Sequence, residues 1–272
     1  TPNIMGMFDY HRAGTAGSFT QKFVVVPSNQ TIYKEDMDGT FDNITGAAVI
    51  GANAIPVFCV FDDILTIWFS DNSTPLSWNT TGNVATLAGS PAAGRGAVVH
   101  ANRLWSWGDN ANPSRISYSA YGDPETHSGS DSGFLDIAVS DGDRIIGAVS
   151  YKGTLAVFKG PNKGSIHFIE GLAVGDFQAS PNTIRGIALH SHNSIVHVGD
   201  DVWFMSRRGI HSLKETFATG NYAMADISRY QYGFFRNTVS LTDANLAGVW
   251  GINYASKSCA MWALTQSGQT EP

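Results

Sequence analysis

The sequence predicts an all-β protein, a β-propeller of about six blades in which each blade is an antiparallel meander. Three observations support this fold class. Apolar hairpins recur along the whole chain, they follow one another at a roughly even spacing, and Gly, Asn, Asp and Pro fill the segments between strands. Helix signals are nearly absent. We therefore expect a single propeller domain over residues 1–272.

The clearest repeat lies at residues 97–119. An apolar run at 97–100, a two-residue turn signal at Ala101 and Asn102, and an alternating run at 103–107 predict a β-hairpin. A loop of Gly, Asp, Asn and Pro then leads into a third alternating run at 115–119. Three antiparallel strands in a row form a meander.

The same hairpin pattern occurs at five further places, namely 22–33, 57–69, 145–158, 194–205 and 248–264. The second strands of all the hairpins centre near residues 32, 67, 105, 156, 203 and 261. This spacing of roughly 35 to 60 residues is typical of propeller blades. Trp105, Phe158, Phe204 and Trp262 take equivalent positions in four of these strands, so we expect them in the core.

The segments around the hairpins complete the expected blades, in chain order. A short strand at 4–11 precedes the first blade, and the second blade ends in a polar loop at 70–82 that contains Trp78. The third blade runs into an exposed loop at 122–133, and the fourth begins at Phe134 and has its third strand at 165–169. Residues 172–182 connect to a fifth blade at 184–216, and 217–245 lack a clear strand. The sixth blade stops after two strands, so either the N-terminal strand completes it or the natural chain is longer.

Composition excludes several classes of protein. The net charge of −6 argues against general affinity for nucleic acid, which requires a basic surface, and we expect no sequence-specific nucleic-acid partner. No apolar run is long and uninterrupted enough for a membrane span, so no membrane partner is expected. Cys59 and Cys259 both lie in apolar strands, and we expect buried free thiols rather than a disulfide.

One segment departs from the acidic balance, because basic residues and histidines gather in it. They are Arg185, Arg207, Arg208 and Lys214, with His190, His192, His197 and His211. A local patch for an anion or a partner is one interpretation, and an ordinary solvated surface is the one we prefer. His190, His192 and His197 also suggest a metal site, but no Cys or carboxylate completes the set, so we expect an exposed strand end and no metal.

Catalytic patterns are weak. The acid pairs Asp62 with Asp63, Asp141 with Asp143, and Asp200 with Asp201 all fall in turns between strands, where Asp is favoured for its hydrogen bonds to the backbone. Asp71 and Trp78 resemble part of a sialidase-type loop, but their spacing is too long and the loop glycine is missing. No nucleophile, phosphate or dinucleotide motif is present. We expect no catalytic residue and no cofactor.

Several short motifs in order resemble the β-propeller virion proteins of tailed bacteriophages. They are NRLW.W at 102–107, NPSR.SYS at 112–119, YGDPE at 121–125, L.VFK at 155–159 and GDDVWFMSRRGIHSL at 199–213. The resemblance covers roughly residues 20–265. It implies a structural component of the tail or the head-to-tail region, without enzyme activity, that is part of the virion and assembled in the host cytoplasm. Such a domain is often one part of a longer chain.

The resemblance also implies partners, namely other virion proteins and copies of the chain in a symmetric ring. Segments outside the blades are free to contact them, and 217–245 is the strongest candidate because of its aromatic side chains. The candidate interface residues are Tyr222, Tyr230, Tyr232, Phe234 and Phe235, with Arg207 and Arg208. Packing of these aromatics onto the propeller's own rim is equally open. The alternative function is a glycan-binding or glycan-cleaving propeller, such as a receptor-binding or sialidase-like protein.

Overall fold

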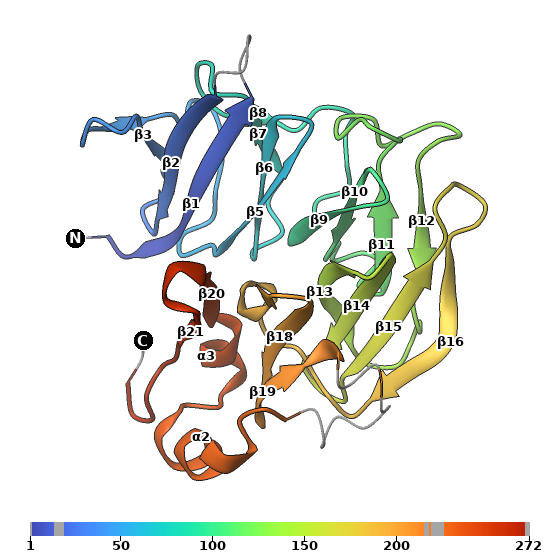
Figure 1. Ribbon diagram of the computed structural model, residues 1–272. Coiled ribbons are helices and arrows are strands. Elements are labelled where there is room, and N and C mark those ends of the chain that lie inside the picture. Colours follow the sequence, from blue (N-terminus) through green and yellow to red (C-terminus); the bar gives the residue numbers. More distant parts are fainter. Residues whose placement is uncertain (1, 14–18, 215–217, 219–225, 270–272) are drawn as a thin grey trace. The chain divides into compact units, whose positions relative to one another are not determined.

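The computed structural model describes residues 2–13, 19–214, 218 and 226–269 (Figure 1). Its strands form antiparallel sheets in which each strand pairs with the next one along the chain. The chain divides into two compact units, Thr1–Asp136 with Leu172–Asp176, and Ile137–Gly171 with Phe177–Pro272. Among the described residues, each unit contains three sheets.

The first unit holds three four-stranded sheets, each a meander. The first sheet consists of β1 (Ile4–Ala13), β2 (Phe19–Pro27), β3 (Tyr33–Glu35) and β4 (Phe41–Asn43). The second consists of β5 (Pro56–Phe61), β6 (Ile64–Phe69), β7 (Leu76–Trp78) and β8 (Ala85–Thr86). The third consists of β9 (Gly96–His100), β10 (Arg103–Trp107), β11 (Arg115–Tyr118) and β12 (Gly133–Asp136).

In the part of the second unit that the structure describes, there is one sheet of four strands, one of three and one of two. They are β13 (Arg144–Tyr151), β14 (Thr154–Gly160), β15 (Ser165–Glu170) and β16 (Gln178–Arg185); β17 (Val196–Val198), β18 (Asp201–Ser206) and β19 (Gly209–Ser212); and β20 (Trp250–Tyr254) with β21 (Cys259–Ala263). Two α-helices are described, α2 (Tyr232–Thr238) and α3 (Asp243–Ala247). Short 3-10 turns are η2 (His192–Ser194), η3 (Arg229–Gln231) and η4 (Ala255–Lys257).

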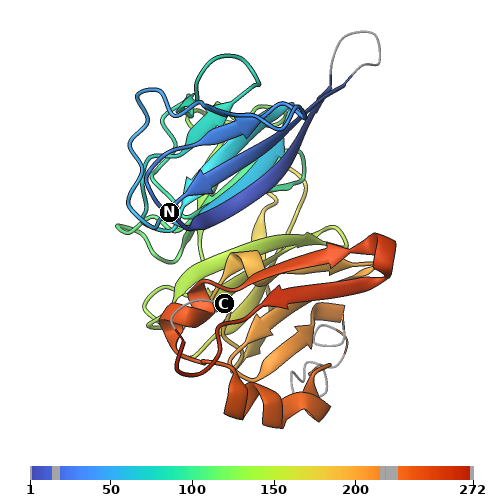
Figure 2. The same ribbon diagram turned by 90° about the vertical axis from the view of Figure 1, so that its left-hand side faces the viewer.

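Successive sheets pack through their first strands, which is how propeller blades are arranged. In the first unit β1 contacts β5 and β5 contacts β9 (Figure 1). In the second unit β17 contacts β20, which with β21 forms the red hairpin in Figure 2. The rings of Phe158 on β14 and Phe204 on β18 meet at 5.0 Å, which joins two successive sheets. The predicted fold class, an all-β propeller, is therefore confirmed.

Apolar side chains of the second strands fill the space between the sheets, as predicted. Trp105, Phe158 and Phe204 are almost completely buried, on β10, β14 and β18 respectively. Trp262 was also expected in the core but is only half-buried on β21, where its Nε1 donates to the carbonyl oxygen of Ser194 at 2.9 Å. Burial of such large aromatic side chains is the main stabilising term in each unit.

Tight turns join the hairpins where the sequence predicted them. Asp62 and Asp63 have φ of 49° and 56°, and Ala101 and Asn102 have φ of 48° and 54°. Two consecutive residues in the left-handed region give the turn whose twist matches that of the flanking strands. The acid pair Asp62 and Asp63 therefore stands in a hairpin turn.

Some expected blade boundaries are wrong. Phe134 belongs to β12, the fourth strand of the third sheet, and does not begin the fourth blade. Residues 178–185, assigned to a connector and the start of the fifth blade, form β16 and pair with β15; Pro181 is tolerated there because β16 is an edge strand. The strand at 4–11 is part of the first sheet as β1, which pairs with β2. Within the described residues the sixth sheet has only β20 and β21.

Two side chains were placed wrongly by the sequence. Trp78 was expected in a polar loop, but it ends β7 and is only 2% exposed, since its ring packs on Tyr10 at 5.9 Å and its Nε1 donates to the carbonyl oxygen of Gly82. Cys259 was expected to be buried, but it lies exposed on β21, whereas Cys59 is buried. Both cysteines are free thiols, as predicted.

Candidate functional site

The helical segment that follows β19 carries three exposed aromatic side chains. Tyr230 is 84% exposed, Tyr232 53% and Phe234 48%, and they come from η3 and α2. The Arg229 guanidinium lies over the Tyr230 ring at 4.8 Å from its centroid. We call Tyr230, Tyr232 and Phe234 the aromatic surface. Tyr222, the other candidate tyrosine of this segment, lies outside the described residues.

Phe235, next to Phe234 on α2, is buried and anchors the helix. It is 5% exposed and belongs to a cluster with Met205, Leu246 and Val249, so it joins α2 to β18 and α3. The N-terminus of α3 is capped by Thr242, whose Oγ1 accepts a hydrogen bond from the amide of Asn245 at 3.3 Å. Packing on the chain's own rim, the alternative that the sequence left open, therefore holds for Phe235.

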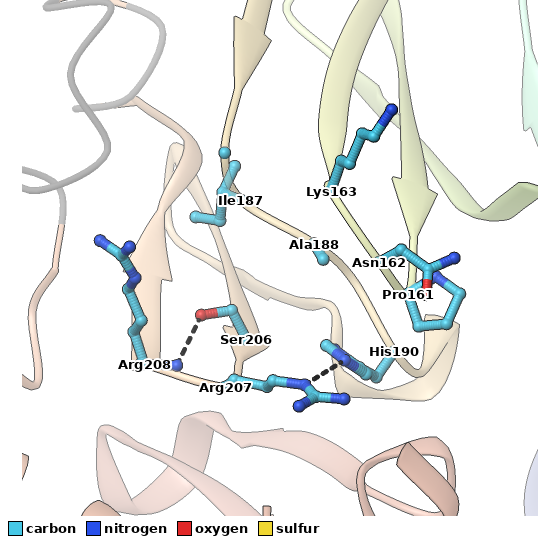
Figure 3. A pocket seen from close by; sticks show the side chains of 10 residues that line it. Pro161, Asn162, Lys163, Ile187, Ala188, His190, Ser206, Arg207 and Arg208 are labelled. Carbon is cyan, nitrogen blue, oxygen red and sulfur yellow. Dashed lines mark hydrogen bonds between the residues drawn. The ribbon is translucent and has the colours of Figure 1, made fainter. Parts of the chain in front are cut away.

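A pocket of about 360 Å³ in the second unit gathers basic side chains from distant parts of the sequence (Figure 3). We call it the basic pocket. It is lined by the β14–β15 turn, the connector after β16 and the β18–β19 turn. The lining residues are Pro161, Asn162, Lys163, Gly186, Ile187, Ala188, His190, Ser206, Arg207 and Arg208.

The turn that carries Lys163 is held by a buried carboxylate. Asp143, which is 7% exposed, accepts hydrogen bonds from the amides of Asn162, Lys163 and Gly164 at 2.8, 3.0 and 2.8 Å. Hydrogen bonds to a charged acceptor are roughly twice as strong as those between neutral groups. Asp143, from the acid pair with Asp141, therefore fixes one wall of the pocket.

Glycine allows that turn to lie directly against the connector. Gly164 has a φ of 71°, and a Cβ placed there would come within 2.3 Å of the Ala188 nitrogen. A Cβ at Gly160 would come within 2.3 Å of the Leu189 carbonyl oxygen. Only a residue without a side chain permits such an approach, so the two walls are held at close range.

Arg207 and Arg208 form the two-residue turn between β18 and β19. Ser206 Oγ accepts a hydrogen bond from the Arg208 amide at 3.0 Å and is 2.8 Å from Nε2 of the buried His211. Arg207 Nε donates to His190 Nε2 at 3.1 Å (Figure 3). Its guanidinium also pairs with the Asp243 carboxylate. Because Asp243 begins α3, Arg207 connects the pocket to the helical segment.

The protonation states in the pocket follow from burial and from Arg207. The pKa of His190 is lowered, first by its burial and then by the Arg207 charge, so its ring is neutral at pH 7 and Nε2 accepts from Arg207. The Arg207 guanidinium holds the pKa of Asp243 below its usual range. The Asp243 carboxylate therefore balances the Arg207 charge, and Lys163 and Arg208 supply the remaining positive charge of the pocket.

The other members of the basic and histidine-rich segment lie apart from the pocket. Lys214 pairs with Asp200 at 2.8 Å, His192 is half-buried in η2, and His197 is exposed on β17. An exposed strand end was expected for His190, His192 and His197, but only His197 lies on a strand, whereas His190 is buried in the connector before η2. Among the residues that the structure describes, no group of three or more His, Cys, Asp or Glu side chains could hold a metal ion.

The acidic candidates make hydrogen bonds that hold turns. Asp141 accepts from the buried Lys159 at 2.9 Å, and Asp201 accepts from Trp203 Nε1 at 2.9 Å and from Ser212 Oγ at 2.6 Å. Asp71 accepts from the Gly51 amide at 3.0 Å and from Ser73. Asp71 therefore joins its loop to the segment before β5, and Trp78 is buried.

Sequence reasoning found Arg207, Arg208 and His190 but missed Lys163 and Asn162. These two residues lie more than forty positions before the arginines and stand in an ordinary turn of the sequence, GPNKG. Only the pairing of β14 with β15 and the packing of residues 186–190 bring them to the pocket. No helix in the described part of the chain is long and apolar enough to span a membrane.

No protein-family model matches the chain, and no curated protein is significantly similar to it. A chain in the crystal structure of BBS1N in complex with ARL6DN is 15% identical, with 78% of this chain and 62% of that chain covered and a TM-score of 0.43. A chain in the structure of YCF48 bound to D1 peptide is 11% identical, with 70% of this chain and 65% of that chain covered and a TM-score of 0.39. A chain in the crystal structure of the Nidogen/Laminin complex is 10% identical, with 76% of this chain and 74% of that chain covered and a TM-score of 0.41. The chain spans less than two thirds of the first two matched chains.

Proposed function

We propose that this chain is a structural component of a tailed-phage virion, in the tail or the head-to-tail region, which binds neighbouring virion proteins and performs no catalysis. The motifs that resemble phage propeller proteins support this role. In the structure they fall on core hairpins and their turns, NRLW.W on β10 and GDDVWFMSRRGIHSL on β18 and β19. They define the scaffold, and its partners meet the loops and helices outside the sheets.

The aromatic surface is the observation that carries the proposal. Three large aromatic side chains that are 84%, 53% and 48% exposed lie within five residues on η3 and α2. Leaving such side chains in water loses the stabilisation that their burial provides, and Tyr, Phe and Arg are enriched where proteins meet. Their helix is held by the buried Phe235, so the surface is presented on a fixed support.

The surface also fits the expected assembly. Copies in a symmetric ring meet through two different patches, and the aromatic surface supplies one of them. The chain's net charge of −6 opposes association of copies without the complementary partner. We therefore expect the isolated chain to be monomeric or weakly associating by light scattering at micromolar concentration.

Incorporation into phage particles tests the function. A tagged chain would be expressed during infection by a phage that encodes it, and purified particles would be probed by immunoblot and by antibody labelling in the electron microscope. We expect labelling of the tail or neck. Particles that lack the chain would refute the virion role.

Variants of the aromatic surface test the interface. Tyr230→Ser combined with Phe234→Ser should reduce incorporation several-fold without changing the unfolding midpoint, because both side chains are exposed. Phe41→Ser is the matched control, since Phe41 is 58% exposed on β4. Equal incorporation of the double variant and the control would remove the aromatic surface from the interface.

A further inference from the structure

The lining of the basic pocket has an unusual charge for this protein. Lys163, Arg207 and Arg208 line it, and none of its ten lining residues is acidic. The chain as a whole has a net charge of −6, from 17 basic and 23 acidic residues. The pocket is therefore a local positive region on an acidic protein, and charge complementarity calls for an anionic ligand.

The backbone that carries these cations is fixed before any ligand binds. Three amides of the Lys163 turn bind the Asp143 carboxylate, and Ser206 binds the amide of Arg208. Arg207 is held by His190 and Asp243. Preorganised walls reduce the entropy lost on binding, which favours the pocket as a recognition site over a mobile loop.

The cations do not converge on one point. In Figure 3 Arg207 points toward His190, whereas Lys163 and Arg208 extend away from it on different sides of the connector at Ile187 and Ala188. A single small ion would contact one of these groups at a time. A ligand with several negative groups along a short chain would satisfy them together.

We infer that the basic pocket binds a short acidic peptide segment of a neighbouring protein, through carboxylates that pair with Lys163 and Arg208 beside the fixed Arg207. A carboxylate fits the planar guanidinium of Arg208 in bidentate geometry. A nucleic acid is less suited, because a long polyanion would also meet the repulsion of the acidic surface. The inference rests on the proposed function only for the source of the segment.

His190 supplies a readout at the pocket itself. Its side chain is 3% exposed and lies beside Arg207, so it experiences the charge of anything bound there. Its pKa is lowered by burial and by Arg207. A bound carboxylate should raise this pKa, and NMR titration of the ring measures the change without any assay of function.

The experiment uses the full chain and a blocked hexapeptide of alternating Glu and Asp, with the corresponding Gln and Asn peptide as the neutral probe. Calorimetry at low salt should detect the acidic peptide alone, and Lys163→Met and Arg208→Ser should each weaken it by about tenfold. Lys257→Met is the matched control, because Lys257 is an exposed lysine of the same unit outside the pocket. Circular dichroism of each variant establishes that it is folded.

Several results would overturn the inference. Equal binding of the acidic and neutral peptides would do so, as would equal weakening of binding by Lys257→Met. An unchanged pKa of His190 in the complex would also contradict it. So would a single-stranded oligonucleotide or inorganic phosphate that binds through Lys163 and Arg208 more tightly than the peptide. A dimer of the chain alone that both pocket variants abolish would identify a second copy as the occupant instead. Absence of peptide binding with normal incorporation into particles would refute only this inference, whereas absence from particles with intact peptide binding would refute only the proposed function.

Discussion

Replacement of Trp105 by Ala tests the packing of the propeller sheets most directly. Trp105 is completely buried on β10, its ring lies 4.8 Å from that of Tyr118, and its Nε1 donates to the His100 carbonyl oxygen at 3.0 Å. Trp105→Ala removes these contacts and leaves a cavity, at a cost of about 3 to 5 kcal/mol.

Thermal and urea unfolding measure this loss. For a chain of this size 1 kcal/mol changes the midpoint by about 2 to 4 °C, so Trp105→Ala should lower it by roughly 6 to 20 °C. Tyr230→Ala is the control, because Tyr230 is 84% exposed and its loss should change the free energy of unfolding by no more than about 0.5 kcal/mol. The sequence alone predicts a similarly small effect for Trp78→Ala, whereas the 2% exposure of Trp78 predicts a large one.

Equal midpoints for Trp105→Ala and Tyr230→Ala would refute the placement of Trp105 between sheets. A small effect of Trp78→Ala, with Trp105→Ala strongly destabilising, would instead contradict the packing of β7 against Tyr10.

Three further outcomes are expected. Burial lowers the pKa of His192 from 6.5 to about 4, so between these pH values the unfolded chain binds a proton that the folded chain does not. The free energy of unfolding should therefore fall by about 2 kcal/mol from pH 7 to pH 5. His192→Gln should reduce this pH dependence in urea titrations, and an unchanged pH dependence would contradict the burial of His192. Asp143→Ala should cost about 2 to 3 kcal/mol, since three amides lose their acceptor, whereas Asp176→Asn at an exposed loop should be neutral in the same titration. Maleimide at pH 8 should modify Cys259 and spare Cys59, whose pKa burial raises to about 12; mass spectrometry after digestion checks this, and rapid modification of Cys59 would argue against its position in the core.

The hairpins could be predicted from the sequence because they depend on local physics. The alternation at 103–107 and the turn residues Ala101 and Asn102 each determine their own strand or turn, and the structure has β10 at Arg103–Trp107 and positive φ at both turn residues. Fold class follows from repetition of such local units. The interior position of Trp105 and Phe204 follows from the same alternation.

The outer strands were harder to predict because they are short and half exposed. β12 and β16 carry little apolar periodicity, and their pairing with β11 and β15 is what makes them strands. Trp78 was assigned to a loop for the same reason, since β7 spans only Leu76–Trp78 and its burial depends on Tyr10, far away in the sequence. Cys259 lies in a strand as predicted, but its exposure depends on what covers that face of β21.

The same difference between local and long-range interactions decides which parts of the candidate site could be predicted. The sequence by itself determined that Tyr230, Tyr232 and Phe234 form an aromatic run outside the strands, and that Arg207 and Arg208 stand in a turn between two of them. Only the tertiary structure decided that Phe235 points inward while its neighbours remain exposed, and that Lys163 meets the two arginines at one pocket. The physical reason is that strands and turns depend on interactions between residues close in the sequence. The burial of a side chain, and the basic residues that share a pocket, depend instead on which distant segments the sheets bring together.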